Sequence, residues 1–227
     1  MKKFMVFAAI LFLASCTGKK EIKQYTIDQF YKNVNIEFSG FSPDETRGLV
    51  TSNETGIYNL FEINFADGSK KQLTFSETES LFGIGYVHDT GQVLYSADKG
   101  GNENNHIYLL NEDGTSTDLT PGDNVKASFS GFSRDKKTMY LTSNKRDPRF
   151  FDLYKMNVGD WKEEMLWENK EGLDYAGASK DRSLIATVKS ITTSESKLFI
   201  INLSTGETVE VSEPDKPGVY SASGFTN

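Results

Sequence analysis

One stretch, Phe38-Ser39-Gly40-Phe41-Ser42-Pro43-Asp44, comes back along this 227-residue chain. A close copy is Phe129-Ser130-Gly131-Phe132-Ser133-Arg134-Asp135, and looser copies are Phe82-Gly83-Ile84-Gly85-Tyr86-Val87-His88-Asp89 and Ala178-Ser179-Lys180-Asp181. Each copy ends in a step with Asp, which suits a tight turn because the Asp side chain hydrogen-bonds the backbone two residues further on. The stretch therefore predicts a strand followed by a turn, repeated along the chain.

The copies are evenly spaced. Phe41, Tyr86, Phe132 and Ala178 lie 45, 46 and 46 residues apart, and a further 47 residues lead to Phe225 in a last Ser-Gly-Phe. Each repeat holds four short apolar or alternating runs, and Asp-Gly pairs such as Asp67-Gly68 separate the later ones. Gly tolerates the positive φ angle that tight hairpin turns require. Four strand-sized runs in each repeat indicate an all-β fold.

The size of the repeat identifies the architecture. Four strands in about 45 residues make one blade of a β-propeller. A β-sandwich has similar strand spacing, but it does not repeat one four-strand motif. We therefore predict an all-β protein, a β-propeller with four-stranded blades at residues 35–75, 80–121, 126–168 and 174–212, and the start of a fifth blade at residues 219–227.

The fifth blade has begun when the sequence ends at Asn227. Two interpretations fit this pattern, a four-bladed ring with a tail or the front portion of a larger ring. The repeated Ser-Gly-Phe favours the second, so residues 25–227 are predicted to form an incomplete ring. In that case blade 4, around Leu198 to Leu203, has a face made for a further blade, because Leu198-Phe199-Ile200-Ile201 is continuously apolar.

The N-terminus carries an export signal. Lys2 and Lys3 precede an apolar run of eleven residues, which is too short to span a membrane as a mature helix. The run leads into Leu13-Ala14-Ser15-Cys16, and Cys16 is the single cysteine of the chain. This pattern resembles a bacterial lipobox, in which the cysteine is lipidated and becomes the first residue. We predict a lipoprotein signal peptide at residues 1–15, lipidation at Cys16 and a polar tether at residues 16–24.

The charge of the chain excludes one class of partner. The net charge is −7, and without residues 1–15 it becomes −9 because Lys2 and Lys3 are lost. Nucleic-acid binding needs a basic face, so we predict no nucleic-acid partner. With no second cysteine the chain cannot form an internal disulfide, and packing alone must stabilise it.

The repeats resemble those of TolB-type propellers, which carry a Phe-Ser-Pro-Asp step followed by a strand and a Ser-Asn. Within that superfamily the chain is most similar to the N-terminal propeller of prolyl-oligopeptidase-family serine peptidases, of the dipeptidyl-peptidase and acylaminoacyl-peptidase type. The segments that carry the closer match are Phe41 to Asp44, Thr51 to Asn59, Lys71 to Thr74 and Ser143 to Tyr154. The resemblance covers residues 25–227 and is more specific for the superfamily than for the peptidases.

The resemblance implies a catalytic α/β-hydrolase domain with Ser, Asp and His, the Ser lying on a Gly-x-Ser-x-Gly elbow. The sequence contains no such elbow. Ser42, Ser133 and Ser179 follow the first strand of a blade and are predicted to be structural. His88 at a turn and His106 at the start of a strand lie in no pattern typical of a base or a metal ligand. We predict no catalytic residue, no metal site and no cofactor in this chain.

One loop is more charged than a hairpin needs, Lys145-Arg146-Asp147-Pro148-Arg149-Phe150. Guanidinium groups bind carboxylates through two parallel hydrogen bonds. Arg146 or Arg149 could therefore contact a peptide terminus or a partner domain. The plainer alternative, an internal salt bridge with Asp147 or Asp152, is the one we favour.

These observations lead to a functional prediction. The chain is the substrate-gating propeller of an exported serine peptidase that acts on short peptides, with the catalytic domain absent from this chain and this segment inactive alone. The predicted partners are membrane lipid through Cys16, a peptide substrate and that missing domain. The predicted location is the bacterial cell envelope, as a periplasmic or outer-membrane lipoprotein. The alternative is a non-enzymatic TolB-like periplasmic binding or scaffold propeller.

Overall fold

The computed structural model describes residues 22–226, which belong to two units. The first unit ends at Val34, and its described part contains one short helix, α2 (Ile27–Tyr31). A capping box begins this helix, because the Thr26 side chain accepts a hydrogen bond from the backbone of Gln29 and the Gln29 side chain accepts one from the backbone of Thr26. Cys16, the predicted lipidation site, lies outside the described residues.

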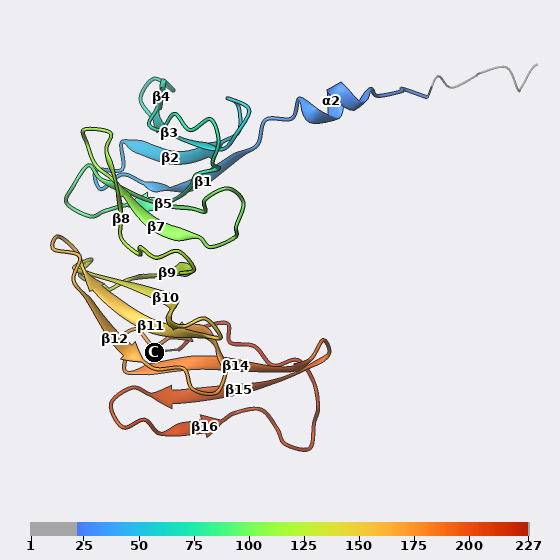
Figure 1. Ribbon diagram of the computed structural model, residues 1–227, viewed down its shortest axis with the longest axis vertical. Coiled ribbons are helices and arrows are strands. Elements are labelled where there is room, and N and C mark those ends of the chain that lie inside the picture. Colours follow the sequence, from blue (N-terminus) through green and yellow to red (C-terminus); the bar gives the residue numbers. More distant parts are fainter. Residues whose placement is uncertain (1–21, 227) are drawn as a thin grey trace, which may run out of the picture. The chain divides into compact units, whose positions relative to one another are not determined.

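The second unit contains four antiparallel sheets, each built from four consecutive strands (Figure 1). Blade 1 consists of β1 (Ile36–Phe41), β2 (Arg47–Ser52), β3 (Asn59–Asn64) and β4 (Lys70–Gln72), and blade 2 of β5 (Phe82–Tyr86), β6 (Val93–Ala97), β7 (His106–Leu110) and β8 (Ser116–Asp118). Blade 3 consists of β9 (Ala127–Phe132), β10 (Thr138–Asp147), β11 (Phe150–Asn157) and β12 (Glu163–Trp167), and blade 4 of β13 (Asp174–Ala178), β14 (Leu184–Thr192), β15 (Glu195–Asn202) and β16 (Thr208–Glu210). The predicted all-β class and four-stranded repeats are confirmed.

The glycine of the recurring motif, which reads Ser-Gly-Phe in blades 1 and 3, lies at a β-bulge in the first strand of each blade. The register shifts between Phe38 and Gly40 in β1, and the first strands of the other three blades shift beside the equivalent glycine. A bulge adds one residue to a strand and bends it. Gly131 in β9 has a φ of +112°, where a side chain would be strained. The backbone conformation of the bulge therefore explains why the glycine is repeated.

The Ser-x-Asp step after the first strand forms the same turn in three blades. In blade 1, the Ser42 hydroxyl donates to Asp44 Oδ1 at 2.6 Å and accepts from the backbone N–H of Arg47 at 3.0 Å. Ser133 and Ser179 make the equivalent pairs of contacts in blades 3 and 4. The three serines thus hold turns together. In blade 2 the equivalent residue is Val87, and it is fully buried.

Three hydrophobic clusters lie between successive blades. Leu49 and Leu60 of blade 1 pack with Tyr95 and Leu110 of blade 2, and similar clusters join blade 2 to blade 3 and blade 3 to blade 4. Each internal blade uses one face for the preceding blade and the opposite face for the next, as the alternation of side chains along a strand allows. Trp161 borders the second of these clusters, and Trp167 borders the third.

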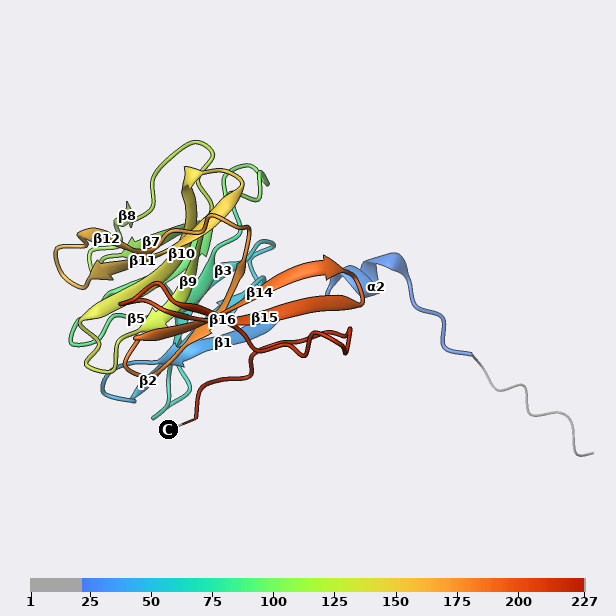
Figure 2. The same ribbon diagram turned by 90° about the horizontal axis from the view of Figure 1, so that it is seen from below.

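The second and third strands lengthen in blades 3 and 4. Figure 2 shows β14 and β15 side by side along most of their length, and the pairing runs from Leu184 with Asn202 to Thr192 with Glu195. The hairpin of β10 and β11 likewise runs out to Asp147 paired with Phe150. The charged loop predicted from the sequence is therefore the tip of an extended hairpin.

Candidate functional site

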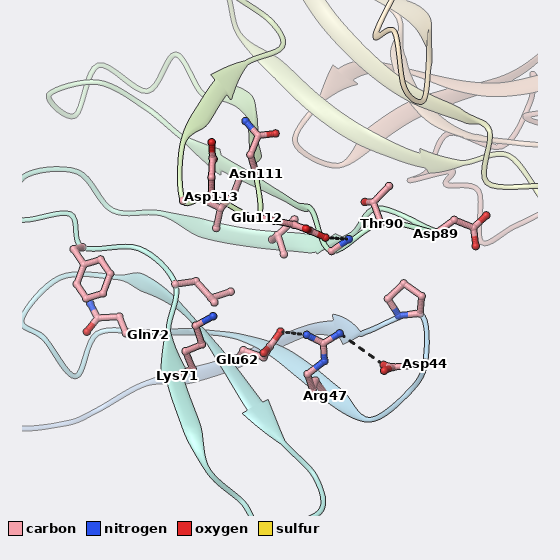
Figure 3. Close-up of a pocket in the computed structure, with 17 residues that line it drawn as sticks. Asp44, Arg47, Glu62, Lys71, Gln72, Asp89, Thr90, Asn111, Glu112 and Asp113 are labelled. Atoms are coloured by element: carbon pink, nitrogen blue, oxygen red, sulfur yellow. Dashed lines mark hydrogen bonds and ion pairs between the residues drawn. The ribbon is translucent and has the colours of Figure 1, made fainter.

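A groove of about 730 Å³ opens between blades 1 and 2 (Figure 3). Its lining comes from turns and strands that are far apart in the sequence: Pro43, Asp44 and Arg47, then Glu62, then Lys71 to Leu73 and Phe75, then Asp89 to Gly91, then Val93, and finally Leu110 to Gly114. The turn that follows the first strand contributes to the lining from both blades. The groove is thus a product of blade packing.

Arg47, at the start of β2, organises the wall formed by blade 1. Its Nη1 lies 3.0 Å from Oε2 of Glu62, and its Nη2 lies 3.9 Å from Oδ1 of Asp44. The Tyr86 hydroxyl of blade 2 donates to the same Glu62 oxygen at 2.8 Å. Burial, reinforced by the hydrogen bond to Glu62, raises the pKa of Tyr86, so this donor keeps its proton. The three side chains join blade 1 to blade 2 beside the groove.

The opposite wall is the β7–β8 turn of blade 2. Glu112 Oε1 accepts from the backbone N–H of Gly91 at 3.0 Å, which fixes one turn against the other. Asn111 Oδ1 accepts from the Gln92 side chain at 2.7 Å. Hydrogen bonds from Thr115 lower the pKa of Asp113. These contacts hold polar oxygen atoms along the rim.

The groove carries more negative than positive charge. Five carboxylates line it, those of Asp44, Glu62, Asp89, Glu112 and Asp113, against two cations, Arg47 and Lys71. The hydrogen bond from Ser42, followed by those from Thr46, lowers the pKa of Asp44 to about 2, so this group is ionised at neutral pH. Apolar side chains, Phe75 among them, complete the lining. Chemically, the groove suits a ligand that is cationic or rich in hydrogen-bond donors and has a small apolar part.

His106 lies at the far end of β7 from the groove, next to a second hollow of about 280 Å³. Its Nδ1 is 2.7 Å from Asp118 Oδ2, and its ring stacks on Tyr108. Blade 4 has an ion pair at the equivalent place, between Lys197 and Glu210. Phe199 pairs with Glu210 in the ladder as Tyr108 pairs with Asp118, so Lys197 corresponds to His106. A Lys–Glu pair at the equivalent position indicates that both pairs pin the third strand of a blade to the fourth. His88 lies at a turn, 3.3 Å from Asp89.

Arg146 is placed inside an internal network. Its Nε and Nη2 donate to both carboxylate oxygens of Asp152 at 2.7 and 2.9 Å, and Nη2 also reaches the backbone carbonyl of Asn169. Asp152 is fully buried and accepts a further hydrogen bond from the Asn169 backbone. These hydrogen bonds, with the nearby charge of Asp152, raise the pKa of Arg146. The arginine ties the β10–β11 hairpin to the segment after β12.

Arg149 is placed differently. It is paired with Asp147 at the hairpin tip, with Nη2 2.7 Å from Oδ2, and its guanidinium lies 5.0 Å from the centre of the Phe150 ring. Its side chain is 74% exposed. The hydrogen bonds from Arg149 lower the pKa of Asp147 to about 2. Lys145, the third cation of the loop, pairs with Glu163 and lies over the Tyr154 ring.

Residues 22–226 contain neither a cluster of metal ligands nor a membrane-spanning helix. No group of three or more His, Cys, Asp or Glu side chains in this part of the chain is arranged to hold a metal ion. No helix in the same range is long and apolar enough to cross a membrane.

Sequence reasoning did not find the groove. Its residues come from separate segments with no fixed spacing, and each segment on its own looks like an ordinary polar turn. The sequence of blade 1 did carry a partial signal for the Arg47–Glu62 pair. Glu62 lies opposite Leu49 in the β2–β3 ladder, so Arg47, two residues before Leu49, is a diagonal neighbour of Glu62 on the same face of the sheet. The second blade's contribution had no such signal.

Comparison with solved structures identifies the fold. TolB from Acinetobacter baumannii superimposes with a TM-score of 0.54 at 19% identity, over 78% of this chain and 43% of that chain. A structure from a study of two prolyl endopeptidases has a TM-score of 0.57 at 14% identity, over 83% of this chain and 30% of that chain. An oligogalacturonate lyase in complex with manganese has a TM-score of 0.57 at 15% identity, over 78% of this chain and 52% of that chain.

These similarities show a β-propeller fold like that of TolB and prolyl endopeptidase propeller regions. At these identities they show the fold alone, and proteins of different activity share it. This chain spans between about a third and half of the length of these three structures. No protein-family model matches the chain, and no curated protein matches it either.

Proposed function

We propose that this chain is the substrate-gating propeller of an exported serine peptidase that acts on short peptides. The observation that carries the proposal is the set of blade motifs most similar to peptidase propellers, on a fold whose likeness to a prolyl endopeptidase structure covers 83% of this chain. The likeness covers 30% of that structure, which leaves room for a catalytic domain elsewhere in it. The α/β-hydrolase domain of the proposed peptidase lies outside this chain.

The propeller acts by excluding substrates. In the complete ring that we propose, the blades surround a passage that admits short or unfolded peptides and rejects folded proteins. Ser42, Ser133 and Ser179 each hydrogen-bond the Asp of the turn that they hold, so the proposal gives them a structural role and assigns bond cleavage to the separate catalytic domain. In this proposal the segment selects peptide substrates by size before the catalytic domain cleaves them.

A labelling experiment tests the proposal. The coding sequence that follows Asn227 in the parent gene is expected to encode a Gly-x-Ser-x-Gly with Asp and His downstream. A serine-directed fluorophosphonate should label the full-length product at that serine and should leave residues 25–227 unlabelled. Stoichiometric labelling of a serine within residues 25–227, or a parent sequence without the elbow, would refute the proposal.

We propose in addition that Cys16 anchors the protein in the cell envelope as a lipoprotein. A single acyl chain holds a protein only marginally, so stable anchoring implies several chains or a second membrane contact. Cys16→Ser should release the protein from membranes or leave the precursor uncleaved. The measurement is membrane fractionation combined with mass spectrometry of the N-terminus, and unchanged fractionation with normal processing would contradict it.

A second candidate is a TolB-like binding propeller without enzymatic activity, and the groove between blades 1 and 2 favours it. A short cationic peptide such as trilysine should then bind near Glu112 and Asp113. Changes in the NMR chemical shifts of these residues would measure the binding. Glu112→Gln should weaken this binding, whereas Glu207→Gln, an exposed carboxylate outside the groove, should not. Groove binding together with an absent elbow in the parent gene would favour this candidate over the peptidase.

A further inference from the structure

The segment before the propeller exposes an unusual number of apolar side chains. Six of the thirteen residues from Ile22 to Val34 are large and apolar, and every one of them is more than half exposed. The values are 85% for Ile22, 56% for Tyr25, 74% for Ile27, 63% for Phe30, 85% for Tyr31 and 54% for Val34. Single exposed apolar residues are ordinary, but a contiguous group marks an interaction surface.

These side chains are ordered along a helix face. Ile27, Phe30 and Tyr31 follow the i, i+3, i+4 spacing that places residues on one side of a helix, and Val34 would continue the row at i+7. The helical positions between them carry Asp28 and Gln29. The capping box at Thr26 defines where the helix starts. A helix this short is marginal in water, so its apolar side needs a surface to stabilise it.

The charge of the segment identifies that surface. Residues 17–34 contain Lys19, Lys20, Lys23 and Lys32 against Glu21 and Asp28, a net charge of +2. The rest of the chain differs in sign: six of the 25 basic and two of the 32 acidic residues precede Asn35, which leaves a net charge of −11 for residues 35–227. Anionic lipid attracts lysines close to a membrane surface and repels an acidic domain.

We propose that residues 22–34 lie on an anionic lipid surface as a short interfacial helix. Ile27, Phe30 and Tyr31 enter the headgroup region, and Lys23 and Lys32 face the lipid phosphates. Aromatic side chains with a polar tip favour this depth, and Tyr25 and Tyr31 both provide one. The contact does not require acylation of Cys16, but it would supply the second membrane signal that an acyl anchor needs for stable attachment.

The test is hydrogen exchange of the full chain, measured with vesicles of phosphatidylcholine and phosphatidylglycerol, with vesicles of phosphatidylcholine alone and without vesicles. Amides of residues 29–32 should exchange about tenfold more slowly on the anionic vesicles, because the interface stabilises the hydrogen-bonded part of the helix. Phe30→Ser should abolish the protection. Phe41→Ser is the matched control, because Phe41 is equally exposed at 61% and lies in the propeller.

A second variant tests the charge of the segment. Lys32→Gln should weaken binding to anionic vesicles about fivefold and leave binding to neutral vesicles unchanged.

Three outcomes would overturn the proposal. The first is exchange that vesicles do not change. The second is protection already present without vesicles, which would mean that protein covers the apolar face. The third is protection that Phe30→Ser and Phe41→Ser reduce equally, which would mean that the exposed aromatic residues act without regard to position.

Discussion

Two buried threonines show how a single hydroxyl affects stability. Thr51 in β2 and Thr187 in β14 are both almost completely buried. The Thr51 hydroxyl accepts a hydrogen bond from the backbone N–H of Gly83 at 2.8 Å and so links blade 1 to blade 2. The Thr187 hydroxyl is buried and, within residues 22–226, makes no hydrogen bond. A buried polar group without a partner costs free energy that an apolar group of the same shape does not.

Thr187→Val should therefore raise the free energy of unfolding by about 1 kcal/mol. Thr51→Val should lower it by roughly 1–3 kcal/mol, because it leaves the Gly83 amide without an acceptor. Both can be measured by urea unfolding, each variant serving as the control for the other. A destabilised Thr187→Val would mean that the hydroxyl has a partner such as a bound water.

Asp44 connects turn geometry to the pH dependence of stability. Its pKa is about 2 in the folded chain against 3.8 ordinarily, chiefly because of the Ser42 hydroxyl. Asp181 shows the same shift through Ser179. A lowered pKa stabilises the folded state above the unfolded pKa, and this stabilisation is lost as the pH falls through the folded pKa. Stability should therefore fall between about pH 4 and pH 2.

Ser42→Ala should raise the pKa of Asp44 toward its ordinary value and flatten that part of the pH profile. It should also cost about 1 kcal/mol, because the partly buried Arg47 amide loses an acceptor. Carboxyl titration by NMR gives the pKa, and thermal unfolding from pH 2 to pH 6 gives the profile. An unchanged Asp44 pKa in the variant would show that the Thr46 contacts cause the shift.

At the scale of elements, the β10–β11 hairpin separates two arginines that look equivalent in the sequence. Arg146 is bonded to the fully buried Asp152, whereas Arg149 pairs with Asp147 at the exposed tip. Removing one partner of a buried pair leaves an uncompensated charge, but an exposed pair contributes little. Arg149 is accordingly the residue of the two that is available to a peptide terminus or a partner domain.

Arg146→Met should lower the melting temperature by roughly 5 °C or more, whereas Arg149→Met should change it by about 1 °C or less. Differential scanning calorimetry of both variants gives the comparison. If Arg149 contacts a partner domain, Arg149→Met should affect only the parent protein. Equal melting temperatures for the two variants would contradict the assignment of Asp152 as the main partner of Arg146.

At the scale of the whole molecule, blades 1 and 4 each have a face that is partly exposed. Phe38, Phe41 and Phe65 are about half exposed and contact one another, and the pairing of Phe38 with Val50 places Phe38 opposite the Leu49 face that packs on blade 2. In blade 4, Val209 is 51% exposed and pairs with Ile200, opposite the Ile201 face that packs on blade 3. These are the same two kinds of face that meet between the internal blades.

Exposed faces of this kind should make residues 25–227 associate or unfold without a single sharp transition, because apolar sheet faces and open sheet edges invite pairing. Phe38→Ser combined with Phe41→Ser should reduce association in size-exclusion chromatography. Phe30→Ser is the control, since that residue lies in the other unit. A sharp, reversible, monomeric transition of the unsubstituted chain would instead indicate a four-bladed propeller that is stable by itself.

The sequence by itself determined the all-β class, the four four-stranded repeats and the turns between strands. These features depend on contacts within a few residues: the Ser42 hydroxyl reaches Asp44 and Arg47, and the glycine of Ser-Gly-Phe sits at a bulge in its own strand. Local contacts leave a periodic signature, so the repeat length and the hydrophobic alternation were sufficient.

Only the tertiary structure decided which side chains meet across blades. The groove joins Arg47 and Glu62 to the turns at Gly91 and Glu112, and the choice of Asp152 as partner of Arg146 depends on where the segment after β12 lies. The exposure of the Ile27, Phe30 and Tyr31 face is likewise visible only in three dimensions. Contacts between blades join residues with no fixed spacing along the chain, so they follow from how blades pack, and only pairs within one hairpin leave a partial pattern in the sequence.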